Sequence, residues 1–281
     1  MDYVCQPVST ENYPYCTDGK LHIFSYKQKH PSYTPTGVCF VGDEDKFSAG
    51  DYQDPGYWKI GIVLQDVNRA VQCFKEHGIH VKTGGQFVDV GFLTSLRDPQ
   101  GYGIELLQET FEDNFKPMRG EKVAPLKQPY HPAVGQITIR CTDAEKTCHF
   151  YTEVLGMKLV CTEVPGNKYP FTLYFFAYTT EHPPNKDVSA VENREWLYQR
   201  PFCQIEIQHR HNLPSTFSYQ TGDDQGEESL RLGHVGISLQ VSRQRFEEIS
   251  KGKGVSVTKD GNVAHLNDPD GYFIELSCEE F

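Results

Sequence analysis

Hydrophobic residues recur along this chain in short runs, a pattern that is typical of β-strands. The clearest runs lie at residues 57–64, 136–140 and 232–239, and each is rich in β-branched or aromatic residues. Each run is followed by a stretch in which apolar residues recur every three or four positions, and that spacing predicts an amphipathic helix. We therefore expect the order strand, helix, strand, strand, strand to occur repeatedly.

Capping residues mark the helix boundaries in the first two repeats. Asp66 or Asn68 is expected to cap the first helix, and Gly78 is expected to end it, because glycine readily takes the left-handed conformation that closes a helix. In the same way, Asp143 is expected to cap the second helix and Gly156 to end it. These signals place both helices directly after a predicted strand.

The remaining elements are short strands joined by polar loops. A long loop is expected at residues 179–193, and a third helix at residues 243–249. Further strands are predicted at residues 21–26, 36–41, 79–82, 92–96, 102–106, 158–164, 172–178, 203–209, 255–258, 264–266 and 272–276.

A turn that leads into a strand occurs twice with nearly the same residues. Residues 268–276 read Asp-Pro-Asp-Gly-Tyr-Phe-Ile-Glu-Leu, and residues 98–106 read Asp-Pro-Gln-Gly-Tyr-Gly-Ile-Glu-Leu. Proline and glycine favour a tight turn, and the following residues favour a strand that carries one carboxylate, Glu275 or Glu105. A solvated surface glutamate is the simpler interpretation of either residue, but the duplication favours a functional one.

The repeats suggest a division of the chain into segments. Residues 1–20 show no periodicity and are expected to be irregular, and residues 21–108 form a partial unit. Residues 109–133 contain several proline dipeptides without periodicity, so they are expected to be a linker. Residues 134–281 are expected to form one domain of two units.

Composition and charge exclude several classes of protein. The 281 residues are 38% hydrophobic and carry a net charge of −11 without a basic block, so a packed globule is expected and a nucleic-acid partner is not. No apolar run approaches the ~18 residues that cross a membrane, and the first residues lack signal-peptide character. The nine cysteines show no zinc-finger spacing and are expected to be reduced, in a cytoplasmic protein.

Four polar side chains stand at corresponding strand positions of the last two units. Gln136, Glu206, His234 and Glu275 make a nitrogen and oxygen set that suits Zn²⁺, Ni²⁺, Co²⁺ or Fe²⁺. A single histidine on a strand is more often structural than a ligand. By spacing alone, the residues therefore fit either a metal site or a site without metal.

Five motifs resemble those of glyoxalase I (lactoylglutathione lyase), a family of the vicinal oxygen chelate superfamily. The resemblance covers about residues 134–281 and implies an α+β fold of tandem βαβββ modules. The motifs are Gln-Ile-Thr-Ile-Arg at 136–140, Phe-Tyr-Thr-Glu-Val-Leu-Gly-Met-Lys-Leu at 150–159, Phe-Thr-Leu-Tyr-Phe-Phe-Ala-Tyr at 171–178, Gly-His-Val-Gly-Ile at 233–237 and Asp-Pro-Asp-Gly-Tyr-Phe-Ile-Glu at 268–275.

The resemblance implies a metal-dependent carbon–sulfur lyase. Its reaction converts the hemithioacetal of methylglyoxal and glutathione, or another thiol, through an enediolate to the lactoyl thioester. Gln136, Glu206, His234 and Glu275 are implied as ligands of a divalent ion, Zn²⁺ or Ni²⁺ with Co²⁺ or Fe²⁺ as alternatives. Glu275 is implied as the general base and Glu206 as its counterpart.

The resemblance also implies substrate contacts. Arg140 matches the arginine that binds the γ-glutamyl carboxylate of glutathione, and an apolar pocket lies beside it. Arg210 stands where the family has an asparagine, and Arg231 lies one place from the family's arginine; both are expected to contact the substrate. The implied apolar pocket residues are Phe171, Leu173 and Phe175.

Two other functions fit the same fold. Arg210, and Lys59 at the strand position of His234, favour a non-catalytic or repurposed small-molecule-binding protein. An extradiol dioxygenase would need two histidines and a carboxylate, and Gln136 stands where its first histidine would be.

The pairing of the units is a further open point. Gln136 and Glu206 are predicted to meet the third unit, within one chain or across a homodimer. The alternative is that they face Lys59 and Glu105 of the first unit. The first unit itself resembles part of a glyoxalase module and is expected to be free of metal.

Overall fold

A computed structural model describes residues 21–24, 36–41, 56–98, 101–112, 133–166, 168–200, 202–219, 221 and 234–278. For residues 21–24, 36–41, 133, 234–238 and 240 it describes the backbone. The predicted irregular segment 1–20 and most of the predicted linker lie outside the described residues. Within the described part of the chain, no helix is long and apolar enough to cross a membrane.

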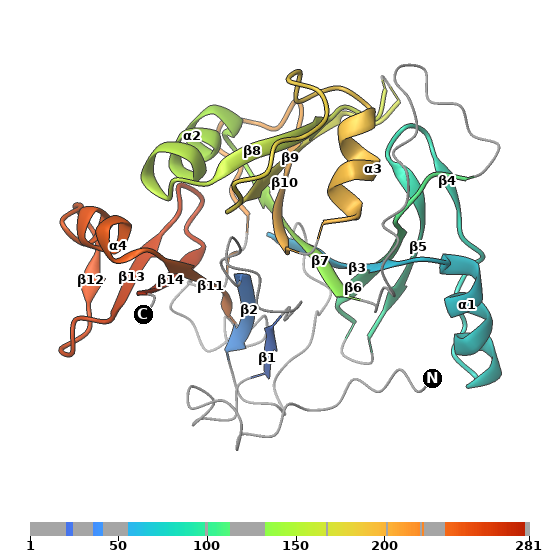
Figure 1. The fold of residues 1–281 in the computed structure, drawn as a ribbon, viewed down its shortest axis with the longest axis horizontal. Helices are drawn as coiled ribbons and strands as arrows, with labels where there is room; N and C mark the ends of the chain where they lie inside the picture. The colour runs from blue at the N-terminus through green and yellow to red at the C-terminus, as the bar shows by residue number, and fades with distance from the viewer. Residues whose placement is uncertain are drawn as a thin grey trace.

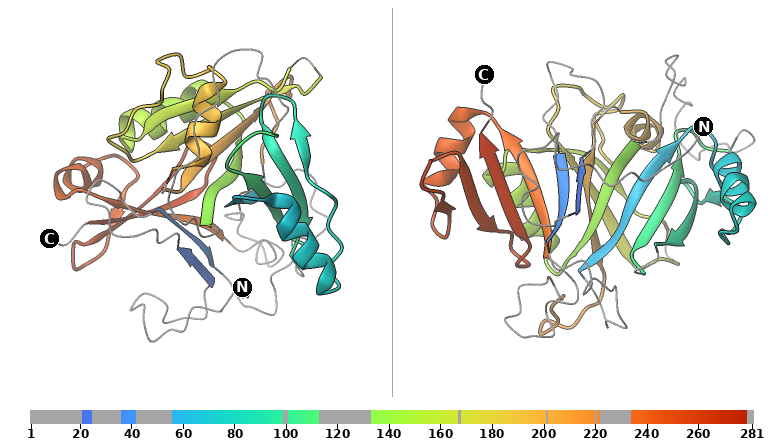
Figure 2. Two further views of the ribbon diagram at one scale, coloured as in Figure 1. Left: turned by 45° about the vertical axis from the view of Figure 1, so that its right-hand side comes forward. Right: turned by 90° about the horizontal axis from the view of Figure 1, so that it is seen from below.

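The larger of two sheets has eight strands and curls around its own concave face (Figure 1, Figure 2). Its two central strands, β3 and β7, are antiparallel, and each has a parallel neighbour, β6 beside β3 and β10 beside β7. In spatial order the strands are β4 (Gly85–Phe87), β5 (Gly91–Arg97), β6 (Gly103–Gln108), β3 (Tyr57–Leu64), β7 (Ala133–Cys141), β10 (Gln204–Arg210), β9 (Phe171–Ala177) and β8 (Lys158–Glu163).

The smaller sheet has six strands and combines the two ends of the chain. Strand β2 pairs antiparallel with β11, and β11 pairs parallel with β14. In spatial order the strands are β1 (Leu21–Phe24), β2 (Thr36–Val41), β11 (His234–Val241), β14 (Phe273–Cys278), β13 (Val263–Asn267) and β12 (Ser256–Val257). The segment 134–281 contributes β7 to β10 to the larger sheet and β11 to β14 to the smaller sheet, and its grouping into one domain stays a prediction.

The helices begin and end where the sequence predicts in the first two units. Asp66 accepts a hydrogen bond from the backbone N–H of Arg69, and Asp143 accepts one from that of Lys146. Gly78 and Gly156 both have positive φ after the helix ends. The helices are α1 (Val67–Glu76), α2 (Ala144–His149) with a π-helical continuation η3 (Phe150–Val154), α3 (Glu192–Tyr198) and α4 (Arg243–Ser250).

Helix α3 packs inside the concave face of the larger sheet (Figure 1). Leu197 and Trp196 join Phe175, Leu107 and Val63 in one buried apolar cluster. The cluster fills the part of the half-barrel beneath α3 with hydrophobic side chains. The polar residues of the same strands lie outside this apolar cluster.

Two local predictions are wrong. Residues 79–82 are irregular, and the edge strand is β4, a few residues later. The segment after residue 191 contains helix α3, which was not predicted. The predicted α+β fold of βαβββ units is otherwise confirmed.

Candidate functional site

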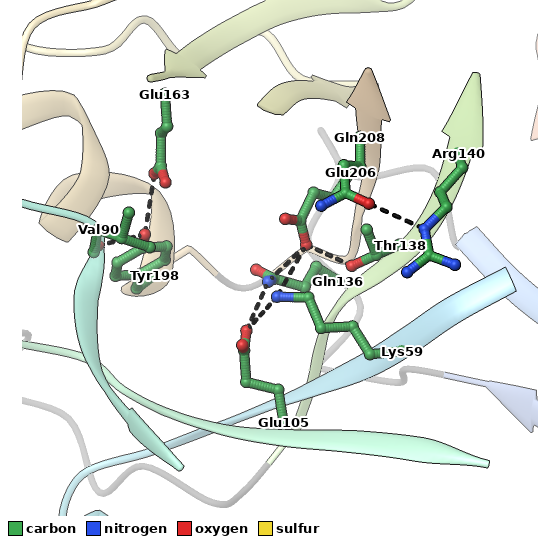
Figure 3. Close-up of polar contacts among 10 residues, drawn as sticks. All are labelled: Lys59, Val90, Glu105, Gln136, Thr138, Arg140, Glu163, Tyr198, Glu206 and Gln208. Carbon is green, nitrogen blue, oxygen red and sulfur yellow. Dashed lines mark hydrogen bonds and ion pairs between the residues drawn. The ribbon is translucent and has the colours of Figure 1, made fainter. Parts of the chain in front are cut away.

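Four polar side chains meet on the concave face of the larger sheet (Figure 3). They are Lys59 of β3, Glu105 of β6, Gln136 of β7 and Glu206 of β10, and all four are buried. The strand registers explain why these four side chains lie close together. Glu105 pairs with the residue two places after Lys59, and Glu206 pairs with the residue two places after Gln136. We call these four residues the barrel cluster.

The barrel cluster is held together by charged hydrogen bonds. Lys59 Nζ lies 2.5 Å from Glu105 Oε1 and 3.5 Å from Glu206 Oε2. Gln136 Nε2 donates to Glu206 Oε2 at 2.8 Å and to Glu105 Oε1 at 3.3 Å. Thr138 Oγ1 also donates to Glu206 Oε2. Lys59 thus bridges two carboxylates that belong to different repeat units.

Burial and charge act in opposite directions on these groups. Burial lowers the pKa of Lys59, but Glu105 and Glu206 raise it, and the net shift of the Lys59 pKa is upward. Burial raises the pKa of Glu206, and Lys59 opposes that rise. Lys59 is therefore an ammonium at neutral pH, and the cluster carries a built-in positive charge.

Two oxygen atoms of the barrel cluster lack a hydrogen-bond partner among the described residues. They are Gln136 Oε1 and Glu206 Oε1, and both atoms are buried. In Figure 3 they point to the same side, away from Arg140. Buried acceptors without a donor are unusual, so this side of the cluster is suited to a group that brings hydrogen-bond donors.

Aromatic and basic side chains border the barrel cluster. Arg140 Nε donates to Gln208 Oε1 at 2.8 Å, and the guanidinium carbon lies 5.4 Å from the centre of the Trp58 ring. Phe171 packs edge-on against Trp58, with 6.0 Å between ring centres. Lys59 Nζ lies 4.7 Å from the Trp58 ring centre. These half-buried rings and guanidinium form the border of the polar cluster.

The other predicted substrate residues lie at different depths. Leu173 and Phe175 are buried in the apolar cluster under α3, so they support the half-barrel from within. The guanidinium of Arg210 lies 6.0 Å from the ring centre of Phe217. Arg231 lies outside the described residues.

The remaining two predicted metal ligands belong to the smaller sheet. Ser238 pairs with Glu275, so Glu275 lies opposite a residue four places after His234. Glu275 Oε2 lies 3.2 Å from His265 Nε2. Of His234 the structure describes the backbone. In the single chain Gln136 and Glu206 therefore face the first unit, which is the arrangement that we did not favour.

A pocket lies elsewhere, between η3, α4 and β13. Its volume is about 960 Å³, and its walls include Phe150, Arg245, His265 and Phe273. None of the predicted site residues lines it. This pocket is therefore separate from the barrel cluster.

A second buried polar network, missed at the level of sequence, fixes helix α3. Tyr198 Oη lies 2.6 Å from the Val90 carbonyl oxygen and 2.9 Å from Glu163 Oε1, and its single hydroxyl proton is shared between these two acceptors. Arg194 Nη1 donates to the Asp89 carbonyl at 2.6 Å. Burial raises the pKa of Glu163 to about 7. Helix α3 thus links β8 to the chain preceding β5.

Strand alternation could have revealed some of the missed site residues. Thr138 lies two places after Gln136, and Gln208 lies two places after Glu206, so each shares a strand face with a predicted residue. Trp58 gave no such signal, because a register irregularity between β3 and β7 at residues 57–59 changes the alternation there.

Comparison with known proteins agrees with this architecture. A profile of the Glyoxalase/Bleomycin resistance protein/Dioxygenase superfamily matches residues 133–190. The lactoylglutathione lyase of Pseudomonas putida is 31% identical over 157 residues, which cover 52% of this chain and 87% of that protein. The chain belongs to the glyoxalase family.

Longer relatives of the glyoxalase family match more of the chain. Glyoxalase I of Saccharomyces cerevisiae is 27% identical over 235 residues, which cover 79% of this chain and 63% of the yeast protein. This chain therefore spans less than two thirds of that relative. Glyoxalase I of Zea mays has a similar fold, with a TM-score of 0.51 at 18% identity, over 92% of this chain and 83% of the maize chain.

Proteins of this family generally depend on a metal ion, and the donor atoms of the barrel cluster decide whether it fits one. Glu105, Gln136 and Glu206 offer oxygen donors of the right chemistry. The ammonium of Lys59, however, already lies among these residues, in contact with Glu105 Oε1 and Glu206 Oε2, and a protonated amine cannot be a ligand. The barrel cluster with Lys59 in it therefore does not fit a divalent ion.

Proposed function

We propose that this protein is a glyoxalase-type carbon–sulfur lyase. Its substrate would be the hemithioacetal of a glutathione-type thiol and a 2-oxoaldehyde such as methylglyoxal, and its product the 2-hydroxyacyl thioester. The reaction moves one proton from the carbon that bears sulfur to the neighbouring carbonyl carbon, and the hydroxyl proton to the former carbonyl oxygen, with no net oxidation. The relatives named lactoylglutathione lyase, at 27% to 31% identity, support this class of reaction.

The observation that carries the proposal is the pairing of a donor with unpartnered acceptors in the barrel cluster. Lys59 presents a buried ammonium, and Gln136 Oε1 and Glu206 Oε1 are buried acceptors without partners among the described residues. A hemithioacetal carries a hydroxyl group beside a carbonyl group. Its hydroxyl can donate to the acceptors while its carbonyl oxygen accepts from the ammonium.

The same residues supply proton transfer. Glu206 is the proposed base, because its burial raises its pKa and so makes the carboxylate a stronger proton acceptor. As the proton leaves carbon, negative charge develops on the former carbonyl oxygen, where the Lys59 ammonium stabilises it. Glu206 then returns the proton to the adjacent carbon, and the hydroxyl proton of the first carbon passes to the former carbonyl oxygen, so that the first carbon becomes the thioester carbonyl. Arg140 at the border would bind a carboxylate of the thiol.

Metal ligation by Gln136, Glu206, His234 and Glu275 stays a prediction. The chemistry that such an ion would supply is stabilisation of the developing oxyanion, which the proposal assigns to Lys59 in this barrel. Glu275 as general base likewise stays a prediction, since it lies in the smaller sheet.

A second candidate is a protein of the same fold that binds the thiol conjugate without turnover. It is favoured by one observation: Glu206 is 0% exposed, and its Oε2 is already bound by Gln136, Thr138 and the Lys59 ammonium. A carboxylate held in this way is less free to accept a proton from substrate.

A spectroscopic thioester assay on the full chain separates these functions. The protein is treated with a chelator and assayed with methylglyoxal and a panel of thiols that includes glutathione. The proposal expects turnover that survives chelation and falls by at least about 100-fold in Glu206→Gln, since general bases contribute about that much or more. Glu76→Gln, on the exposed face of α1, is the matched control.

Three results decide against the lyase in the barrel. Binding of an S-alkyl glutathione without turnover, at any metal concentration, would establish the second candidate. Turnover that is lost on chelation and in Glu275→Gln, but kept in Glu206→Gln, would move the chemistry to the smaller sheet. The absence of both binding and turnover would refute both candidates.

A further inference from the structure

We propose that Lys59 is an internal cation that keeps divalent metal out of the barrel cluster, and that exchange of this one residue for a neutral ligand converts the cluster into a metal site. The inference goes beyond the proposed lyase reaction, because it concerns which cation the protein holds at this place. It does not require turnover of any substrate.

The charges of the barrel cluster disfavour a divalent ion while Lys59 is present. Glu105 and Glu206 bring two negative charges, and Lys59 brings one positive charge within 2.5 Å and 3.5 Å of their oxygens. A divalent ion among the same oxygens would lie beside the ammonium in a buried environment, where repulsion between like charges is weakly screened. Without the ammonium, the two carboxylates would be balanced by one divalent ion.

The barrel cluster already holds oxygen atoms that could bind a metal ion. Glu105, Gln136 and Glu206 already converge on the nitrogen of Lys59 or on each other, from three strands of one sheet. One oxygen of Gln136 and one of Glu206 have no partner among the described residues, so they can turn to an ion without the loss of another contact. Three oxygen donors are thus in place, and a fourth ligand is what the cluster needs.

The repeat pattern indicates that position 59 can accept a histidine. Lys59 begins the sequence Lys-Ile-Gly-Ile, and the corresponding strand of the third unit reads His-Val-Gly-Ile from His234. Histidine at position 59 would therefore suit the backbone of this strand. Its imidazole is shorter than the lysine side chain, so it leaves room for an ion between the ring nitrogen and the three oxygens, and it is neutral at pH 7.5 or above.

The test measures bound metal in the full-length chain. All variants are made in a His234→Ala, Glu275→Gln background, so that the other predicted ligands do not contribute. Lys59→His and Lys59→Gln supply a neutral ligand, and Lys59→Arg keeps the positive charge as the matched control. Each protein is incubated with Zn²⁺ or Co²⁺, dialysed and analysed for metal, and thermal melting shows which variants are folded.

The expected result is a gain of about one ion per chain in Lys59→His, with a smaller gain in Lys59→Gln, because one added ligand completes a four-coordinate site. The background protein and Lys59→Arg should hold less than about a tenth of that amount. Bound Co²⁺ should also give visible absorption bands that disappear when Glu206→Ala is added to Lys59→His.

Two results would overturn the inference. One is a background protein that already binds an ion which Glu206→Ala removes, since the ammonium would then exclude nothing. The other is a folded Lys59→His or Lys59→Gln that binds no more metal than Lys59→Arg. Because each readout is metal content, a failure here is distinct from a failure of the proposed lyase, which is read as thioester formation.

Discussion

Lys59 and Glu206 come from different repeat units, yet their charged groups lie 3.5 Å apart in the interior of one half-barrel. Their contact exists because β3 of the first unit and β7 of the second are neighbours at the centre of the eight-stranded sheet. The parallel pairing of β10 with β7 then brings Glu206 to the same face. The site is therefore a property of two repeats together and of neither alone.

Loss of the Lys59 charge should destabilise the protein. Lys59→Met would leave Glu105 and Glu206 buried beside each other without a counter-charge, which costs about 3 to 5 kcal/mol in comparable buried pairs. The measurement is urea unfolding at pH 8. Lys75→Met, on the exposed side of α1, is the control and should change little.

The same variant has an expected pH dependence. Burial raises the pKa of Glu206, and loss of the Lys59 charge removes the group that opposes this rise, so protonation of Glu206 should reduce the penalty of Lys59→Met between pH 8 and pH 5. If Lys59→Met lowers the free energy of unfolding by less than about 1 kcal/mol at pH 8, the size typical of exposed pairs, the ion pairs of Lys59 contribute little to stability.

Much of the local structure could be predicted because it depends on neighbours in sequence. The repeated Asp-Pro-x-Gly turn is an example, since Asp98 and Asp268 each accept a hydrogen bond from the backbone N–H four residues later, at 2.7 and 2.9 Å. The caps at Asp66 and Asp143 are further examples. In each case the side chain acts on its own turn, so the signal is local.

Other features depend on contacts between distant segments and could not be predicted. Helix α3 is buried on every side, including Arg194 and Glu195, so its residues lack the polar face that marks an amphipathic helix. The sequence also could not predict which strand pairs with β7. Strands β3 and β11 have the same apolar pattern, and long-range packing decides which of them pairs with β7.

Arg140 should control the affinity for the thiol. Arg140→Ala removes a guanidinium that Gln208 holds at 2.8 Å and that lies over Trp58, so a carboxylate of the ligand would lose its charged partner. Charged hydrogen bonds are worth about 1.5 to 3 kcal/mol, so binding of an S-alkyl glutathione should weaken by roughly 10- to 100-fold. Titration of tryptophan fluorescence measures this.

The specificity of the Arg140 effect can be checked with two further proteins. Arg69→Ala, on the exposed face of α1, should bind as the wild type does. Arg140→Lys should recover part of the affinity, because it restores the charge without the planar two-nitrogen geometry. Equal affinities for wild type and Arg140→Ala would remove Arg140 from the proposed site.

The hydroxyl of Tyr198 should contribute to stability through helix α3. It bonds the carbonyl of Val90 at 2.6 Å and Glu163 at 2.9 Å, and both acceptors belong to segments far from α3 in sequence. Tyr198→Phe leaves these buried acceptors without that donor and should lower the free energy of unfolding by about 1 to 3 kcal/mol. Tyr169→Phe is the control, since Tyr169 is half-buried and its ring packs against Phe87 and Phe171. Equal losses in the two variants would contradict the prediction.

Glu163 should make stability fall as pH rises. Burial raises its pKa from 4.5 to about 7 in the folded protein, while Arg194 opposes that rise and Glu206 adds to it. Below pH 4.5 the carboxyl is protonated in both folded and unfolded chains. Between about pH 4.5 and pH 7 the unfolded chain has released this proton and the folded chain still holds it, so the stability that the neutral acid supplies is lost across that window, by up to about 3 kcal/mol.

Glu163→Gln isolates this contribution. The amide keeps the shape of the acid and can still accept from Tyr198, but it does not titrate, so the variant should be less stable relative to wild type at pH 4.5 than at pH 7.5. Other groups that titrate in this range, such as Asp268, are present in both proteins and cancel in the difference between their unfolding curves. Glu76→Gln, on the exposed face of α1, is the matched control for the substitution. A difference for Glu163→Gln that stays constant between pH 4.5 and pH 7.5 would mean that the folded chain ionises Glu163 as easily as the unfolded chain does.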